Sequence, residues 1–376
     1  MVDINTFKYN KIHPELEIAR GKIINVLLDR FYDVCVRINK MARKDKTDDW
    51  VIRFCWKNSA DSQIDPVIPY RENEDYDVEQ LKIDLTNADY DATAVLNEVN
   101  LRKFLKLSID TFDTFYNSLN YDEPIVIKDT GTELIYKKNS VKYGNVVMLS
   151  FDKFYDNTAP NKLALFFCIL YRYDILGARN HQLSVEPRFK NDLRVNFNIN
   201  TELFGSCINR FYDHYCSLYY DLEKYFGSMG NVFDTQFTKG FYFANPPFDE
   251  AVMKKLAMKI IMSIERTNDP LGFVVVCPVW DYETMKILSN LCGTKAYNMG
   301  KYDIYDILMK SKYTYKHYVF CKNNFMYYDF SNNKYIGAVN THIFIVKNEQ
   351  LDVDLKVFES LLSKNKLMRI PQRLLE

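Results

Sequence analysis

The sequence has no excess of charge of either sign and little glycine. Its 376 residues contain 49 Lys and Arg against 49 Asp and Glu, so the formal net charge is zero. Tight non-specific binding to long nucleic acid needs a basic balance, and any RNA or DNA site must therefore be a local patch. With 47% hydrophobic residues, 15% aromatic residues and only 12 Gly, the composition indicates a globular chain rather than a disordered one.

The sequence also lacks paired cysteine motifs and long apolar runs. Its eight Cys are scattered, without a Cys-x-x-Cys or Cys/His cluster, which argues against a zinc site and predicts reduced thiols in an intracellular protein. The longest apolar run, Leu163 to Tyr171, is too short to span a bilayer, and the chain begins with no signal-peptide pattern. We therefore expect no metal and no membrane association. Frequent Tyr, Phe, Asn, Lys and Ile hint at an A+T-rich genome, such as that of a virus.

The pattern of the chain changes near residue 150, and its length allows two domains. Residues 1–150 are expected to form a mainly helical domain, with helices over 14–41 and 93–121 and an acidic, loop-like stretch over 65–91. Residues 151–376 alternate helices with short strands, which is typical of an α/β fold with a doubly wound, Rossmann-like sheet. There we expect helices over 161–173, 210–216 and 249–267, and strands over 194–201, 217–220, 241–244, 271–277, 316–321 and 341–346.

The most informative motif is Asn245-Pro246-Pro247-Phe248, directly after the expected strand over 241–244. The amino nitrogen of adenine is a poor nucleophile because its lone pair is delocalised into the ring. The Asn245 side-chain oxygen and the carbonyl of Pro246 can accept from this NH2 group and aim its lone pair at a methyl donor. The two prolines keep that carbonyl rigid, and Phe248 can stack on the base. The alternative is a Pro-Pro turn after a buried strand.

Ligands of a doubly wound sheet bind at the carboxyl ends of its strands. The first expected strand ends at Glu202 and leads into the small-residue turn Gly205-Ser206, where the backbone can approach a cofactor closely. Asp221 follows the next expected strand, and a carboxylate there can bind both hydroxyls of a ribose. Asp234 is a second candidate for that role, and a solvated surface carboxylate is the alternative for both.

The ordered motifs resemble those of the phosphorylated CTD-interacting factor family, the cap-specific adenosine N6-methyltransferases. The resemblance covers about residues 160 to 348. It rests on Arg172-Tyr173, Gln182, Glu202-Leu203-Phe204-Gly205-Ser206, Tyr215-Cys216-Ser217, Asp221, Tyr225-Phe226-Gly227-Ser228-x-Gly230, Gly240-Phe241-x-x-Asn245-Pro246-Pro247-Phe248-x-Glu250, Pro278-x-Trp280 and Asn340-Thr341.

The resemblance implies a class I methyltransferase that uses S-adenosylmethionine to methylate N6 of the 2'-O-methyladenosine beside the cap of mRNA. It implies that Glu202, Phe204, Ser206 and Asn245 border the cofactor and that the motif at Asn245 holds the adenine. It also implies that Glu250 and the Trp280 segment contact the capped substrate. It places such an enzyme in the nucleus, or in the cytoplasm if the chain is viral. The partner would be capped mRNA that begins with adenosine, and no protein partner is indicated.

The cap side of the site can be argued from residue chemistry. A methylated guanine is positively charged and suits an aromatic face beside a carboxylate, which Trp280 with Asp281 or Glu283 provides; core packing is the alternative for Trp280. Arg172 can bind a phosphate bidentately or form a salt bridge with Asp174.

The sequence departs from the family pattern at three places. Cys207 stands where family members usually have Pro, and Asp281-Tyr282-Glu283-Thr284 replaces their basic, acidic and proline residues after Trp280. No amino-terminal WW module of the vertebrate members is recognisable, so a polymerase-tail partner is not expected. Two other functions stay open: methylation of internal RNA or DNA adenine or of cytosine N4, and a methyltransferase-like scaffold without catalysis.

Overall fold

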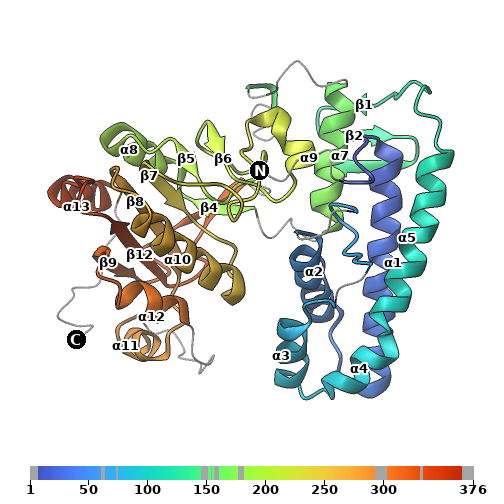
Figure 1. Ribbon diagram of the computed structural model, residues 1–376, viewed down its shortest axis with the longest axis horizontal. Helices are drawn as coiled ribbons and strands as arrows, with labels where there is room; N and C mark the ends of the chain where they lie inside the picture. Colours follow the sequence, from blue (N-terminus) through green and yellow to red (C-terminus); the bar gives the residue numbers. More distant parts are fainter. Residues whose placement is uncertain are drawn as a thin grey trace.

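The computed structural model describes residues 7–60, 64–72, 75–144, 151–153, 155, 161–176, 182–292, 303–330 and 333–365. It has two parts, which lie side by side in Figure 1. In one part, the regular elements described up to Ser118 are all helices, and the other part contains a six-stranded sheet. The helices of the first part are α1 (Pro14–Ile38), α2 (Lys44–Ala60), α3 (Glu79–Asn87), α4 (Ala92–Val99), α5 (Leu101–Ser118) and, from later in the chain, α7 (Lys162–Ile175).

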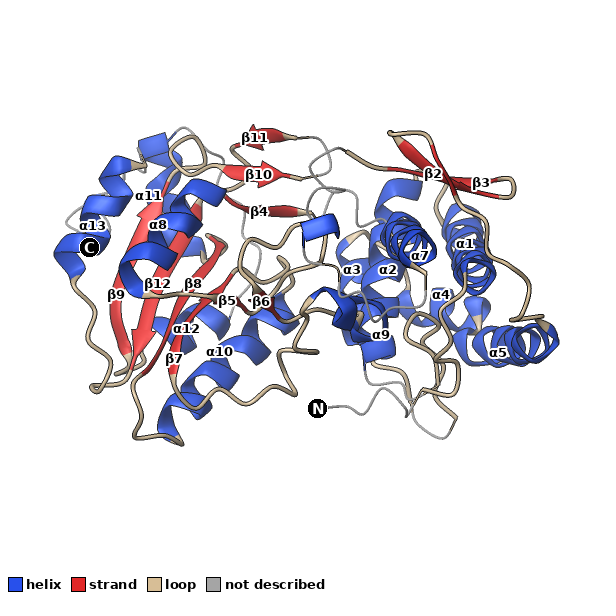
Figure 2. Ribbon diagram, turned by 90° about the horizontal axis from the view of Figure 1, so that it is seen from above, coloured by secondary structure: helices blue, strands red, loops and turns tan. Residues whose placement is uncertain are grey.

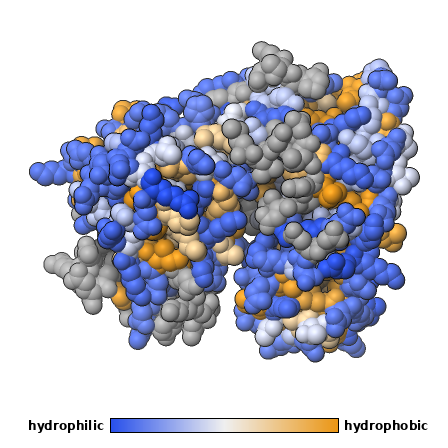
Figure 3. Space-filling model, in the orientation of Figure 1, coloured by the Kyte–Doolittle hydropathy of each residue, from blue (hydrophilic) through white to orange (hydrophobic). Residues whose placement is uncertain are grey.

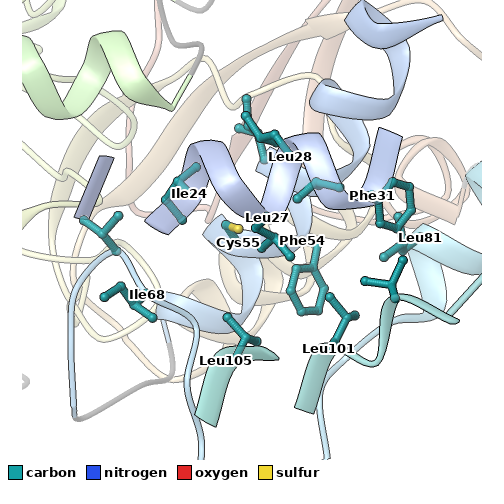
Figure 4. Close-up of a cluster of buried hydrophobic side chains, with 14 of the residues drawn as sticks. Ile24, Leu27, Leu28, Phe31, Phe54, Cys55, Ile68, Leu81, Leu101 and Leu105 are labelled. Atoms are coloured by element: carbon teal, nitrogen blue, oxygen red, sulfur yellow. The ribbon is translucent and has the colours of Figure 1, made fainter. Parts of the chain in front are cut away.

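Helix α1 forms the centre of the helical part. Pro14 occupies its first turn, and the Nδ1 atom of His13 accepts a hydrogen bond from the amide of Glu15, so both features favour a helix start here. Its buried face packs against α2, α4 and α5. Figure 4 shows the resulting apolar cluster, which includes Leu27 and Phe31 of α1 and Phe54 of α2.

Two predictions for this part need correction. The helix expected over 93–121 is divided at Asn100, whose left-handed backbone (φ 51°) ends α4 and whose side chain caps α5 through the amide of Lys103. The stretch over 65–91 was expected to be loop-like, but it contains helix α3, which buries Leu81 and Leu85. A two-residue apolar face is too short a pattern to stand out within an acidic segment.

The apolar run from Leu163 to Tyr171 lies in α7, which packs between α1 and a small antiparallel sheet. That sheet contains β1 (Lys128–Asp129), β2 (Glu133–Tyr136) and β3 (Asn139–Lys142). Leu134 and Val141 of the sheet and Phe166 and Phe167 of α7 share one buried cluster. Contacts on both sides therefore account for a helix that is apolar around most of its surface.

The second part is built on a sheet with the strand order β6-β5-β7-β8-β12-β9. Its strands are β5 (Thr201–Glu202), β6 (His214–Tyr215), β7 (Gly240–Ala244), β8 (Leu271–Pro278), β9 (Thr314–Phe320) and β12 (Thr341–Lys347). β6, β5, β7 and β8 run parallel, whereas β12 lies antiparallel between β8 and β9. The prediction of a mixed α/β fold with a parallel-rich sheet is confirmed.

Helices cover both faces of this sheet, as Figure 2 shows. Alternate residues of β8 point to opposite faces: Val274 and Val276 pack with α8 (Pro187–Phe197) and α13 (Leu355–Lys364), and Phe273 and Val275 pack with α10 (Glu250–Glu265) and α12 (Asp303–Met309). Burial on both faces explains why β8 reads as a continuous apolar run. The remaining elements are α9 (Tyr220–Glu223), the 3-10 helix η3 (Lys224–Phe226), α11 (Tyr282–Cys292) and a sheet of β4 (Leu183–Val185), β10 (Tyr327–Asp329) and β11 (Lys334–Ile336).

Three predicted elements before β7 are wrong. Residues 194–197 belong to helix α8, which ends at the left-handed Asn198 (φ 53°), so the strand there is reduced to β5. Residues 210–216 are a turn followed by β6 instead of a helix, because the Glu202 carboxylate accepts the amides of Phe211 and Tyr212 and holds them in a turn. Residues 217–220 lead into α9 and form no strand.

Six of the cysteines whose side chains are described agree with the prediction of reduced thiols, and one does not. Cys35, Cys55, Cys168, Cys207, Cys216 and Cys277 are free and buried. Cys321, directly after β9, is disulfide-bonded, which departs from the expectation of reduced thiols. Among the described helices, none combines the length and the apolar character that a membrane crossing requires.

Candidate active site

The order in which successive strands join the sheet reverses at β5. The chain leaves β5 for β6 on one side and then returns to β7 on the other side. Such a switch point is where open α/β sheets bind ligands, outside the carboxyl ends of the strands. The first residue after β5 lies beside the end of β7, since the amide of Leu203 donates to the carbonyl of Phe243 at 2.8 Å.

Asn245 is the first residue after β7 at this point. Its Nδ2 atom donates to the carbonyl of Val276 in β8 at 3.2 Å, which fixes the orientation of the side chain. No donor in the described ranges contacts its Oδ1 atom, and the residue is half-buried. The amide oxygen is therefore an oriented acceptor that a ligand can reach.

The remaining residues of the motif form a rigid turn with an aromatic end. Pro246 is buried and its carbonyl accepts no hydrogen bond from the described part of the chain, whereas the carbonyl of Pro247 accepts the amide of Asp249. The half-buried ring of Phe248 lies edge-to-face against Trp280 (6.1 Å between ring centroids) and against Tyr327 (6.0 Å). Three aromatic rings from separate elements thus meet beside Asn245.

On one face the two parts of the molecule are separated by a hollow. In Figure 3 this hollow opens between the region of α10 and that of α2 and α3. Burial raises the pKa of Asp84 in α3, Arg53 opposes that shift, and the negative charge of Asp249 at the start of α10 adds to it. The beginning of α10, directly after the motif, is therefore within electrostatic range of the helical part.

The loop after β8 carries the residues expected on the substrate side. Trp280 is half-buried against Phe248, and Glu283 is exposed in the first turn of α11. Glu250 is half-buried in the first turn of α10. Both carboxylate oxygens of Asp281 have partners within the protein. Its Oδ2 atom lies 2.9 Å from Nε2 of His342, and its Oδ1 atom accepts a hydrogen bond from the amide of Thr284. Burial acts to raise the pKa of Asp281, but these partners outweigh it and lower the pKa to about 2.

The turn after β5 has an inner and an outer side. Glu202 is buried and pairs with the equally buried Lys190 at 2.6 Å, and the hydroxyl of Ser206 donates to Gln182 at 2.7 Å. Phe204 and Gly205 are partly exposed instead. The structure therefore turns Glu202 and Ser206 into the protein and leaves Phe204 and Gly205 at the surface of the switch point.

Asp221 and Arg172 pair with each other, at 2.8 Å, in the interior. Arg172 also contacts Glu17 of α1 at 2.6 Å, and only 1% of its side chain is exposed. The expected partners of Arg172 were a phosphate of the substrate or the Asp174 carboxylate. Its partners in the structure are Glu17 and Asp221 instead. The guanidinium is shared between two buried carboxylates that come from α1 and α9.

Asp234 is the exposed carboxylate of this region. It follows Phe233, whose ring lies edge-to-face against Phe204 at 6.3 Å and whose carbonyl accepts Nζ of Lys259 at 2.8 Å. Burial lowers the pKa of Lys259, and the charge of Asp234 opposes this. Phe204, Phe233 and Asp234 thus form an apolar surface with a carboxylate at its edge.

Sequence reasoning missed three residues that support the site. Tyr327 packs against Phe248, His342 holds Asp281, and Glu223 accepts the amide of Cys207 at 2.7 Å and so holds the turn after β5. Nothing in the local sequence marks them, because each acts across a large separation in the chain. Across the described ranges, no group of three or more His, Cys, Asp or Glu side chains is placed to hold a metal ion.

Known sequences resemble this part of the chain. A family model described as the phosphorylated CTD interacting factor 1 WW domain matches residues 150–330. The mRNA (2'-O-methyladenosine-N(6)-)-methyltransferases of Mus musculus and Homo sapiens are each 30% identical to the chain over 131 residues. That alignment covers 33% of this chain but only 19% of either relative. The described residues within 150–330 form helices α7 to α12 and strands β4 to β10, including the switch point and the Asn245 motif.

Proposed function

We propose that this chain is an S-adenosylmethionine-dependent methyltransferase that acts on N6 of the (2'-O-methyl)adenosine beside the mRNA cap. The observation that carries the proposal is the oriented, accessible Oδ1 atom of Asn245 at the switch point of the sheet. The similarity to two mRNA adenosine N6-methyltransferases supports the substrate. The sheet order, with parallel strands on both sides of β5, supports a Rossmann-like class I methyltransferase fold.

The residues at the switch point suit S-adenosylmethionine. Phe204 and Phe233 offer an apolar surface for its adenine, Asp234 a carboxylate for its ribose, and Gly205 a backbone without a side chain. When bound there, the cofactor supplies an electrophilic methyl group on a sulfonium. Glu202, Ser206 and Asp221 are assigned a supporting role, since their side chains are engaged inside the protein.

Asn245 and Pro246 would prepare the amino group for attack. Both N6 hydrogens are directed to acceptors, one to Oδ1 of Asn245 and the other to the carbonyl of Pro246, so the nitrogen lone pair turns out of the ring plane. With the methyl donor bound, N6 would be placed to take the methyl group, and its extra proton would pass to water. Phe248 stacks on the base. The protein contributes positioning and hydrogen bonds rather than a strong base.

Trp280, Glu250 and Glu283 would contact the cap. The ring of Trp280 lies beside Phe248, and the two carboxylates are in the first turns of the helices that follow both loops. A methylated guanine is a cation that such a set can bind. Arg172 and Asp281 are removed from the set of direct contacts, because both are paired within the protein. An enzyme of this kind would act in the nucleus, or in the cytoplasm if the chain is viral.

A labelling experiment tests the cap requirement. The protein is incubated with labelled S-adenosylmethionine and RNA that begins with adenosine, with and without the 7-methylguanosine cap. We expect label only in the capped RNA. Equal labelling of both RNAs would redirect the proposal to internal adenine or to another amino group.

Calorimetric titration with S-adenosylmethionine tests the scaffold alternative. A methyltransferase must bind its methyl donor, so heat of binding is expected for the wild-type chain. The Phe204→Ala variant, which removes part of the proposed apolar surface, should bind more weakly. The absence of any heat at saturating protein would favour a scaffold without catalysis.

A further inference from the structure

A chain of three titratable side chains lies behind the aromatic wall of the site. Nε2 of His342 in β12 is 2.9 Å from Oδ2 of Asp281, and its Nδ1 atom is 2.8 Å from Nε2 of His317 in β9. His342 is completely buried, and 21% of the Asp281 side chain is exposed. The three side chains therefore connect strands β9 and β12 of the sheet to the loop that carries Trp280.

A serine-hydrolase type of proton relay does not fit this arrangement. In such a relay the second nitrogen of the histidine faces a nucleophile at the surface. Here it faces another histidine, whose ring also stacks on Phe344 in the core (4.5 Å between centroids). Burial and the neighbouring His342 lower the pKa of His317 to about 3, so His317 is neutral at physiological pH. The three linked side chains therefore lead from Asp281 to a half-buried, neutral histidine on the edge strand β9.

The same region anchors the backbone around Trp280. The amide of Trp280 donates to the hydroxyl of Tyr305 at 3.2 Å, and that hydroxyl donates to the carbonyl of Pro278. The ring of Tyr305 lies 5.0 Å from that of His342. Trp280 is therefore held on one side by Tyr305 and on the other by Asp281, and both of these contact His342.

We propose that His342 is a positioning residue that fixes the Trp280 loop against Phe248 through Asp281 and Tyr305. It does not contact the substrate. By holding Trp280 in place before the substrate arrives, it reduces the ordering that binding would otherwise require. This inference rests on the proposed function only for its effect on RNA binding, since the placement of Trp280 is a property of the protein alone.

The placement of Trp280 can be measured without any activity. The chain has three Trp, so protein labelled with 5-fluorotryptophan should give three ¹⁹F resonances, and Trp280→Phe identifies one of them. In His342→Leu we expect the Trp280 resonance to shift or broaden while those of Trp50 and Trp56, in α2, stay unchanged. His342→Gln, which can still donate to Asp281, should retain the wild-type resonance. An unchanged Trp280 resonance in His342→Leu would overturn the proposal, as would equal movement of all three.

Kinetics separates positioning from general damage. Loss of one hydrogen bond to a charged group should raise the KM for capped RNA about tenfold in His342→Leu, with the KM for S-adenosylmethionine unchanged. In a Trp280→Ala background the same substitution should add little, because the loop has lost the side chain it positions. Equal changes in both KM values would contradict positioning. If His342→Leu does not fold, Asp281→Ala removes the carboxylate that His342 contacts and carries both measurements.

Failure of the proposed function gives a different result. Wild-type protein would then show no methyl transfer with either RNA, and the fluorine resonances would still report whether His342 fixes Trp280.

Discussion

At the scale of single residues, the proposed function depends on which polar atoms already form hydrogen bonds or ion pairs within the protein. The Nδ2 atom of Asn245 is bound to β8 and its Oδ1 atom is not bound within the described chain, which makes the oxygen an acceptor for a ligand. Arg172, Asp221, Glu202 and Asp281 have the chemistry of ligand-binding residues, but their partners are inside the protein. Whether a polar atom already has a partner within the protein therefore distinguishes candidate ligand-binding residues of the same chemical type.

Asn245→Ala removes the side-chain acceptor and should lower the turnover number by roughly two to three orders of magnitude, the scale of one lost electrostatic contact in an active site. The substitution leaves the backbone of the motif in place, so binding of S-adenosylmethionine should be nearly unaffected. Initial rates of methyl transfer at saturating substrates measure this. Gln350→Ala, which removes an exposed amide after β12, is the matched control and should retain full turnover. Near-normal turnover in Asn245→Ala would remove Asn245 from the mechanism.

The residues of the site differ in how well the sequence predicts them. The Asn245 motif could be predicted because the chemistry needs those residue types in one short segment. The burial of Arg172 could not, because its partners Glu17 and Asp221 are 155 and 49 positions away along the chain. Charged residues are assigned to the surface from sequence alone, and only the fold reveals which of them are paired in the interior.

At the scale of elements, predictions succeeded where the apolar pattern was clear and failed where that pattern was weak or the element was very short. Helix α1 and strands β7, β8 and β12 have clear periodicity or continuous apolar runs, and their positions agree with the sequence. β5 and β6 are two residues each, too short for alternation to show. Their place is fixed instead by side-chain contacts such as that of Glu202 with the amides of Phe211 and Tyr212.

Glu223 links several of these short elements and gives stability a specific pH dependence. Its carboxylate accepts hydrogen bonds from Tyr173 of α7, the amide of Cys207 and Tyr215 of β6. Burial raises its pKa from 4.5 to about 7, although these three donors oppose the shift. Between pH 4.5 and 7 the unfolded chain loses this proton while the folded chain keeps it. The contribution of Glu223 to stability is therefore greatest below pH 4.5 and is lost as the pH rises to 7.

We expect this single group to lower the free energy of unfolding by roughly 3 kcal/mol over that interval, since one unit of pKa is worth about 1.4 kcal/mol. Denaturant unfolding at a series of pH values measures it. Glu223→Gln cannot ionise, so the difference between wild type and variant should change with pH only within this window. A constant difference from pH 4 to pH 8 would show that Glu223 has an ordinary pKa in the folded protein.

At the scale of the whole molecule, a buried series of charges joins the two parts. Asp65 pairs with Arg20, Arg20 with Glu17, Glu17 with Arg172, and Arg172 with Asp221. The series crosses from α1 through α7 to α9, close to the turn after β5. It links the helical part to the switch point through side chains that are all at least nine-tenths buried.

Arg172→Met should destabilise the protein by about 3–5 kcal/mol, because it leaves two buried carboxylates without their shared cation. Equilibrium unfolding in denaturant measures the change. Arg43→Met breaks an exposed pair with Asp45 and should leave the free energy of unfolding almost unchanged. A loss for Arg172→Met as small as that of the control would mean that the series does not join the two parts energetically.

The central claim is that the chain methylates the amino nitrogen of adenosine with Asn245 as an acceptor. The most direct measurement is mass spectrometry of nucleosides from capped RNA that begins with 2'-O-methyladenosine, after incubation with S-adenosylmethionine and either wild-type protein or Asn245→Ala. We predict N6,2'-O-dimethyladenosine with the wild type and almost none with the variant. Methylation of a different atom, or no methylated product from a wild-type protein that binds S-adenosylmethionine, would contradict the account.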